Sequence, residues 1–201
     1  MLQAIDKYFF YLVNHGLAWS VFDAVMPIVT HKFFGLTVFG AVGVYLIVRY
    51  RIDGLIAFAV AAAAVALSDT VGYRVLKPLI GRERPCVELA DVRLLVSMTT
   101  AYSMPSLHAA NAFAFTTAVH RYFPATGSAL LPVAALIAFS RVYVGVHWPG
   151  DVLVGVIFGA VCAAVCTFVE DRVRRYVAAR RGEDYSARGR RANRRRSDPR
   201  R

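Results

Sequence analysis

The segment SRVYVGVHWPGD, residues 140–151, brings an arginine, a histidine and an aspartate together in a largely apolar chain. His147 and Asp151 lie four residues apart, and Pro149 between them suits the first turn of a helix. A carboxylate at this spacing can accept a hydrogen bond from one ring nitrogen and leave the other free to attack, as in a catalytic triad. The pattern predicts that His147 is a nucleophile and that Asp151 orients it.

Two further segments, KPLIGRERP and MPSLH, add cationic groups and a helix start. Guanidinium and ammonium groups suit a bound phosphate, and the free N–H groups at a helix N-terminus also favour an anion. Ser106 follows a proline at such a start, and His108 is placed to protonate a departing oxygen. A phosphate-binding pocket is therefore expected, with the basic residues Lys77, Arg82, Arg84 and Arg141.

The elements that must position these side chains are five charge-free apolar stretches. Hydrophobic residues make up 57% of the 201 residues, which is more than an ordinary soluble domain contains. Most stretches fall slightly short of the roughly 20 residues that cross a bilayer as a helix, so they draw in polar residues at their ends. We expect an all-α, polytopic membrane helical bundle, with a soluble bundle as the alternative. The stretches are 33–48, 54–68, 107–119, 122–140 and 152–169.

Alternating five spans across the membrane sorts the charges. The basic segments 49–53 and 120–128 and the arginine-rich C-terminus fall on one side, which the positive-inside rule assigns to the cytoplasm. The ionisable residues of the motifs then gather on the other side, near the membrane surface, where convergence indicates function. A multi-pass protein of the cell membrane is expected, with its active site facing the periplasmic or extracellular side.

Three regions are expected along the chain. Residues 1–31 suit interfacial amphipathic helices, without a cleavable signal peptide, and residues 32–171 form the membrane core. Residues 172–201 hold thirteen arginines against three acidic residues, within a total net charge of +11. Such a run cannot form a core, so we expect a disordered cytoplasmic tail. It can contact anionic lipid, whereas no nucleic-acid partner is expected.

The motifs 77–85, 105–108 and 140–151 resemble, in order and spacing, those of the type 2 phosphatidic acid phosphatase superfamily. These integral-membrane lipid phosphatases are related to vanadium haloperoxidases and glucose-6-phosphatase, and the likeness covers about residues 30–171. The resemblance implies that His147 forms a phosphohistidine. It also implies that His108 acts first as general acid and then as general base.

The resemblance further implies that four residues hold the phosphoryl oxygens and stabilise the transition state, so that neither a metal ion nor a cofactor is needed. No cysteine in the chain has metal-ligand spacing. Leu107 stands where the family commonly has glycine, which affects pocket shape and substrate fit. Arg82 either touches substrate or anchors its loop. The four phosphate-binding residues are Lys77, Arg84, Ser106 and Arg141.

The function predicted from these features is hydrolysis of a lipid phosphomonoester or diphosphate through a phosphohistidine. Undecaprenyl diphosphate is the first expected substrate, followed by phosphatidylglycerol phosphate and the phosphates of lipid A. A lipid phosphotransferase that uses the same phosphohistidine is one alternative. A non-enzymatic anion-binding scaffold or transporter is another.

Overall fold

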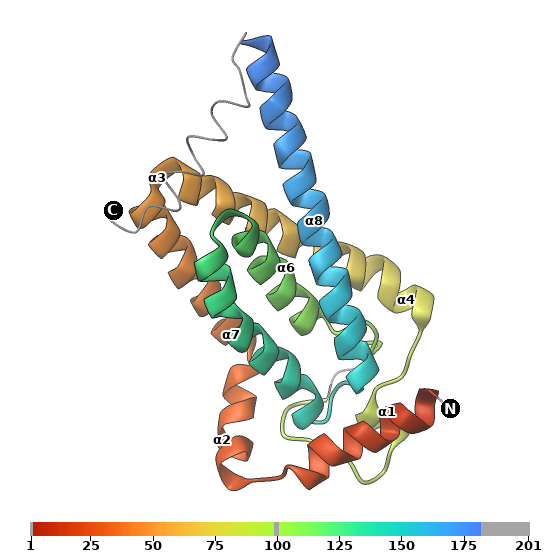
Figure 1. The fold of residues 1–201 in the computed structure, drawn as a ribbon. Coiled ribbons are helices and arrows are strands. Elements are labelled where there is room, and N and C mark those ends of the chain that lie inside the picture. The colour runs from red at the N-terminus through yellow and green to blue at the C-terminus, as the bar shows by residue number, and fades with distance from the viewer. Residues whose placement is uncertain (1, 99–100, 182–201) are drawn as a thin grey trace.

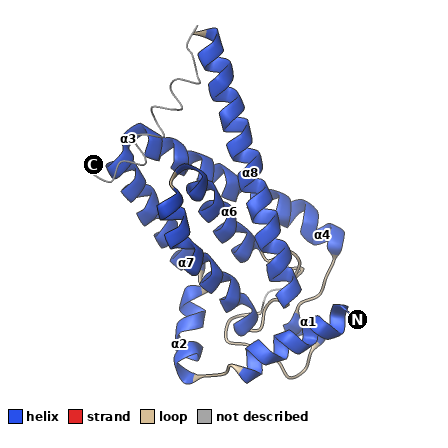
Figure 2. Ribbon diagram, viewed as in Figure 1, coloured by secondary structure: helices blue, strands red, loops and turns tan. Residues whose placement is uncertain are grey.

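The chain is described by a computed structural model that covers residues 2–98 and 101–181. Within these residues the regular secondary structure is entirely helical (Figure 2). Four long helical segments form a bundle, and the N-terminal helices lie at one end of it (Figure 1).

Helix α3 (Lys32–Val71) consists of two arms that turn sharply at Arg51, where φ is 55° and ψ is −123°. The turn falls within 49–53, where the sequence predicts that two apolar segments join. Gly54 makes it possible for the arms to meet, since a Cβ atom there would lie 1.9 Å from the carbonyl oxygen of Leu46. The second arm continues through a π-helical segment, η2 (Gly72–Leu76), into α4 (Lys77–Ile80). It therefore delivers Lys77 to one end of the bundle.

Helix α6 (Leu107–Tyr122) lies at the centre and packs against α3, α7 (Pro124–Tyr143) and α8 (Pro149–Arg180). Small buried residues, among them Ala109 and Ala110, allow its neighbours to approach closely. Gly155 and Gly159 of α8 form a small-residue face of the kind that brings membrane helices into contact. This contact sets the start of α6 beside the start of α8.

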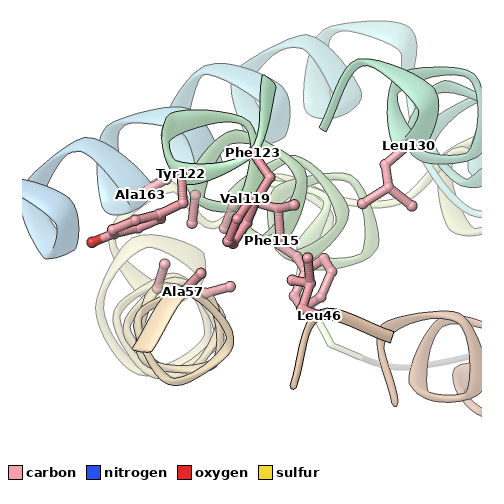
Figure 3. Close-up of a cluster of buried hydrophobic side chains, with 12 residues drawn as sticks. Leu46, Ala57, Phe115, Val119, Tyr122, Phe123, Leu130 and Ala163 are labelled. Atoms are coloured by element: carbon pink, nitrogen blue, oxygen red, sulfur yellow. The ribbon is translucent and has the colours of Figure 1, made fainter. Parts of the chain in front are cut away.

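Larger side chains fill the half of the bundle away from these helix starts (Figure 3). Phe115 of α6 stacks on Phe39 of α3 at 4.2 Å between ring centroids, and Phe123 stacks on Tyr50 at 4.1 Å. Aromatic pairs of this kind contribute about 0.5–1.5 kcal/mol beyond the burial of their surface. This packing holds the framework around which the polar end is built.

In the part of the chain that the structure describes, three helical segments are long and apolar enough to cross a membrane: Lys32–Glu88, Pro124–Tyr143 and Pro149–Arg180. The bent pair Gln3–Gly16 and Ser20–Val29, with 115° between its halves, passes the same test as one unit. The expected count of about five spans stays a prediction. It requires each arm of α3 to cross separately, and it requires α6, which has only 16 residues, to count as a span.

The N-terminal segment contains α1 (Leu2–Tyr11), a π-helical turn η1 (Leu12–Gly16) and α2 (Ser20–Val29). Helix α1 crosses the end of the bundle where α8 begins (Figure 1). Its inner face buries Phe10, and Asn14 is buried in the following turn, whereas Tyr8 and Phe9 on the outer face are exposed. An exposed apolar face agrees with the expected interfacial position.

Helix α8 extends to Arg180, past the expected start of the disordered tail at residue 172. Ion pairs four residues apart join Glu170 to Arg174 and Asp171 to Arg175, and such pairs support an exposed helix. The sequence reading overlooked this pairing. Residues 182–201 of the expected tail lie outside the described residues.

Candidate active site

The turn between α7 and α8 places His147 directly before the helix that begins at Pro149. Asp151 lies in the first turn of α8, and its Oδ2 accepts a hydrogen bond from the backbone N–H of Trp148 at 2.9 Å. The same oxygen lies 3.3 Å from Nδ1 of His147. Both side chains are buried. The predicted pairing of His147 with Asp151 is present in the structure.

Ser103 adds a further hydrogen bond to this pair. Its hydroxyl donates to Oδ2 of Asp151 and lies 3.4 Å from Nδ1 of His147. The backbone N–H of Ser103 donates to the carbonyl of Arg82 at 2.8 Å, which fixes the loop that precedes α6. Asp151 therefore has several donors around it, as a buried carboxylate requires.

Nε2 of His147 faces the guanidinium of Arg84, with 3.2 Å to NH1. Arg84 is held in place because its Nε donates to the carbonyl of Ala101 at 2.6 Å and its NH1 to the carbonyl of Val146 at 2.7 Å. A guanidinium can only donate, so Nε2 must accept and Nδ1 must hold the proton. This tautomer leaves the lone pair of Nε2 beside a cation, where a phosphate can bind.

The pKa of His147 is held well below its usual value of 6.5, firstly by burial and secondly by the charges of Arg141, Arg84 and Lys77. Burial and neighbouring cations both disfavour the imidazolium form. The ring is therefore neutral at physiological pH. A neutral imidazole with an unprotonated Nε2 is the form that is able to attack phosphorus.

A cavity of about 850 Å³ begins at this ring and continues between α2, α3 and α6. Hydrogen bonds to backbone carbonyls and to a hydroxyl group keep the cationic side chains apart. Lys77 donates from Nζ to the carbonyls of Tyr102 and Ser103, and Arg141 donates from NH1 to the hydroxyl of Thr30. The predicted site residues that line the cavity are Lys77, Arg84, Leu107, His108, Arg141 and His147.

Ser106 and His108 lie at the start of α6, as the sequence predicts. Ser106 is the N-cap residue, its hydroxyl is buried without a hydrogen-bond partner, and its backbone N–H donates to the carbonyl of Asp151 at 3.0 Å. An unpaired buried hydroxyl at a helix N-terminus is available to a bound anion. Leu107 and His108 line the cavity, whereas Ser106 is adjacent to this lining in the chain and is buried.

Arg82 lies outside the cavity lining. Its guanidinium donates to Oδ1 of Asp151 at 2.9 Å and to Oδ2 of Asp6 at 2.5 Å. The predicted residues thus converge in one place, while Arg82 donates to the carboxylate oxygen of Asp151 that does not face the histidine. In the described part of the chain Arg82 is the bridge between two carboxylates.

Sequence reasoning missed Ser103, Thr30 and Asp6. Ser103 and Thr30 are common hydroxyl residues in loops and helix ends, without a distinguishing pattern. Asp6 had a signal, because Asp6, Phe10 and Asn14 are spaced by four residues and so share one helix face. All three point toward the bundle, Asp6 to Arg82, Phe10 to Trp148 and Asn14 to the carbonyl of Tyr143.

Comparison with known proteins places this geometry in a family. The chain is 37% identical over 103 residues to YbjG of Escherichia coli (strain K12), provisionally named an undecaprenyl-diphosphatase, and the match covers 50% of this chain and 48% of that protein. The chain thus spans about half the length of this relative. It is 26% identical over 166 residues to the lipid A 4'-phosphatase of Bacteroides thetaiotaomicron, covering 79% of this chain and 73% of the relative.

The fold is similar to the crystal structure of a transmembrane PAP2 type phosphatidylglycerolphosphate phosphatase from Bacillus subtilis. The TM-score is 0.63 at 24% identity, over 86% of this chain and 87% of that one. The prediction of an all-α membrane bundle is thereby confirmed. The model of the PAP2 superfamily matches residues 53–175, which contain all three motifs. The chain belongs to the PAP2 superfamily.

Proposed function

We propose that this protein hydrolyses a lipid phosphate through a phosphohistidine on His147. The observation that supports this most is the orientation of His147, whose Nδ1 faces Asp151 while its Nε2 faces Arg84 at a cavity lined with cations. Nucleophile, orienting carboxylate and anion-binding groups are the three parts that a covalent phosphoryl transfer requires.

In the first step the lone pair of Nε2 attacks phosphorus, an N–P bond forms, and the bond from phosphorus to the leaving oxygen breaks. The negative charge of the bound phosphate stabilises the imidazolium form of His108, against burial and the neighbouring cations. In that form His108 donates a proton to the leaving oxygen, so the alcohol or lipid phosphate leaves in protonated form. The phosphorylated ring retains its Nδ1 proton and becomes cationic. Asp151 stabilises that charge.

In the second step a water molecule attacks phosphorus on the side opposite the histidine. His108, now neutral, accepts the proton from the water, and the N–P bond breaks with its electron pair returning to Nε2. Inorganic phosphate is released, and both histidines return to their starting forms. The two steps together consume one water molecule per phosphate.

Lys77, Arg84 and Arg141, together with Ser106, hold the phosphoryl oxygens in this proposal. Three cationic groups around one phosphate offset the negative charge that a metal ion neutralises in other phosphoryl-transfer enzymes. Turnover is therefore proposed to be independent of metal ions. Removal of one such donor would lower the rate about 10²–10³-fold.

The substrate class proposed is a lipid phosphate with its headgroup at the cations and its chain in the apolar part of the cavity. That part is lined by Leu36, Phe39 and Val65. Undecaprenyl diphosphate is the first candidate, supported by the name of the Escherichia coli relative. Phosphatidylglycerol phosphate and lipid A phosphates follow, supported by the names of the other similar proteins.

The proposed orientation sets the active site toward the outer face of the cell membrane and the arginine-rich C-terminus toward the cytoplasm, in contact with anionic lipid. The basic segments at 49–53 and 120–128 support this, since both lie at the end of the bundle opposite the turn between α7 and α8 (Figure 1).

The test is release of inorganic phosphate by the purified protein in detergent, with EDTA present. Undecaprenyl diphosphate, phosphatidylglycerol phosphate, phosphatidic acid and lipid A would be compared. His147→Ala is expected to abolish release, while His120→Ala, at the opposite end of α6, is expected to leave it unchanged. Undiminished release by His147→Ala would rule out the phosphohistidine. Dependence of release on an added metal ion would rule out the metal-free mechanism.

A further inference from the structure

Asp6 on α1 is joined to the candidate active site by two ion pairs and a backbone hydrogen bond. Its Oδ2 accepts from Arg82 at 2.5 Å, and Arg82 in turn donates to Oδ1 of Asp151 at 2.9 Å. The second oxygen of Asp6 accepts from the backbone N–H of Gly150 at 2.7 Å. Because Gly150 precedes Asp151 in the chain, these groups form a closed ring between α1 and the first turn of α8.

Asp6, Arg82 and Asp151 are shielded from water. The side chain of Asp6 is 13% exposed, that of Arg82 is 22% exposed, and that of Asp151 is fully buried. Arg82 lies over the ring of Trp148 at 5.2 Å, and Trp148 packs against Phe10 of α1 at 5.3 Å. Ion pairs in such surroundings are screened much less by salt and water than pairs on an open surface.

Arg82 without Asp6 would compete with His147 for the charge of Asp151. A guanidinium paired with Asp151 alone would cancel the negative charge of that carboxylate and weaken its hold on the imidazole. Asp6 supplies a second negative charge, so the three ionised groups together retain one net negative charge beside His147. This negative charge has its greatest effect when the imidazole of His147 is phosphorylated and cationic.

We propose that Asp6 is a positioning residue for the phosphoryl transfer, acting through Arg82 and Gly150 to keep Asp151 oriented toward His147 and to keep the net charge of the three ionised groups negative. The inference rests on the proposed role of His147 as nucleophile. It makes the N-terminal helix part of the active site, in addition to any contact that its exposed face makes with the membrane.

The first test is Asp6→Asn, which keeps the shape and an acceptor for Gly150 but removes the charge. We expect kcat to fall about 10–100-fold, which is the loss seen when the hydrogen-bond partners of metal-binding residues are replaced in other enzymes. KM should stay within about two-fold of the wild-type value. Phosphoenzyme trapped by acid quenching should form more slowly by the same factor. Asp6→Glu retains the charge and is expected to recover most of kcat.

Asp23→Asn is the matched control. Asp23 also ties the N-terminal segment to a loop, through a bidentate pair with Arg93 at 2.7 Å, but Asp23 has no contact with Asp151. We expect kcat of this variant to stay close to that of the wild type. Equal losses in both variants would show that loosening of the N-terminal segment explains the effect, and would overturn the proposal.

A double-mutant cycle tests the route through Arg82. If Asp6 acts through this residue, Asp6→Asn will add less than about two-fold to the loss caused by Arg82→Ala. Independent, multiplicative losses would contradict the proposal, and so would a normal kcat for Asp6→Asn or an Asp6→Glu variant no better than Asp6→Asn. An active His147→Ala would instead refute the phosphohistidine itself, so the two failures are distinguishable.

Discussion

Gly159 of α8 lies against the backbone of Ala110 of α6, so closely that a Cβ atom on Gly159 would fall 2.0 Å from the carbonyl oxygen of Ala110. One turn earlier, a Cβ atom on Gly155 would fall 2.6 Å from the carbonyl oxygen of Ser106. The helices that supply Asp151 and His108 are therefore in backbone contact directly beside the active site. Their spacing depends on the absence of side chains at two positions.

Replacement of Gly159 by alanine should force α6 and α8 apart. We expect a loss of stability of about 1–3 kcal/mol, as for other overpacked cores, together with lower activity because His108 moves relative to His147. Thermal unfolding in detergent and phosphate release would measure the two effects. Gly40→Ala is the control, since its Cβ would meet nothing within 4 Å. An equal loss in both variants would mean that close packing is not the cause.

His147 should remain neutral at pH values where an exposed histidine becomes protonated. Its pKa is lowered by burial and by the neighbouring cations, so its ¹⁵N chemical shifts should not change between about pH 8 and about pH 6. NMR of protein labelled at histidine, with His147→Gln to assign the signal, would measure this. A titration near pH 6.5 would contradict the neutral nucleophile.

The lowered pKa of His147 also makes the stability of the protein depend on pH. The unfolded chain takes up a proton at His147 near pH 6.5, whereas the folded protein does not, so stability should decrease as the pH falls below about 6.5. His147→Gln should weaken this dependence. Chemical denaturation of both proteins at several pH values would show whether the slopes differ as expected.

Ser103→Ala should reduce kcat and leave KM nearly unchanged, because the hydroxyl contacts Asp151 and His147 without lining the cavity. A hydrogen bond to a charged group contributes about 1.5–3 kcal/mol, which corresponds to about 10–150-fold in rate if it is lost in the transition state. Ser128→Ala, at the far end of α7, serves as the control. A rise in KM alone would indicate that Ser103 contacts the substrate instead.

In the Arg84→Lys variant, lysine should not restore the function of the arginine. The guanidinium donates to Ala101 and Val146 while facing Nε2 of His147, and a single ammonium group cannot satisfy these directions at once. We expect a loss in kcat/KM of about 10²-fold or more for the lysine variant, near that of Arg84→Ala. Lysine activity close to wild type would show that only the charge at this position matters.

Most residues that meet at the candidate active site could be predicted from sequence because they belong to short motifs whose chemistry is explicit. His147 and Asp151 lie four residues apart, and the turn at Arg51 is flanked by two apolar stretches, so local patterns were sufficient. Asp6 could not be connected to Asp151 in this way, since their contact depends on how α1 crosses the end of the bundle.

The extent of α8 also escaped local reasoning. Helix α6, Leu107–Tyr122, covers the expected apolar stretch 107–119, and its burial at the centre stabilises it through contacts with three neighbours. Helix α8 continues to Arg180 because acidic residues just beyond the apolar stretch pair with arginines one turn later. Both outcomes depend on packing or pairing that composition does not reveal.

The charge-free part of α8 matches the thickness of a membrane. Asp151 and Glu170 bracket the charge-free stretch 152–169, which at about 1.5 Å per residue is about 27 Å long and close to the hydrocarbon thickness of a bilayer. The carboxylate that orients His147 is thus fixed at a set height above the opposite boundary. In a thicker or thinner bilayer the whole active site would shift in depth relative to the lipid headgroups, so that membrane composition itself would tune how readily a phosphate reaches the histidine.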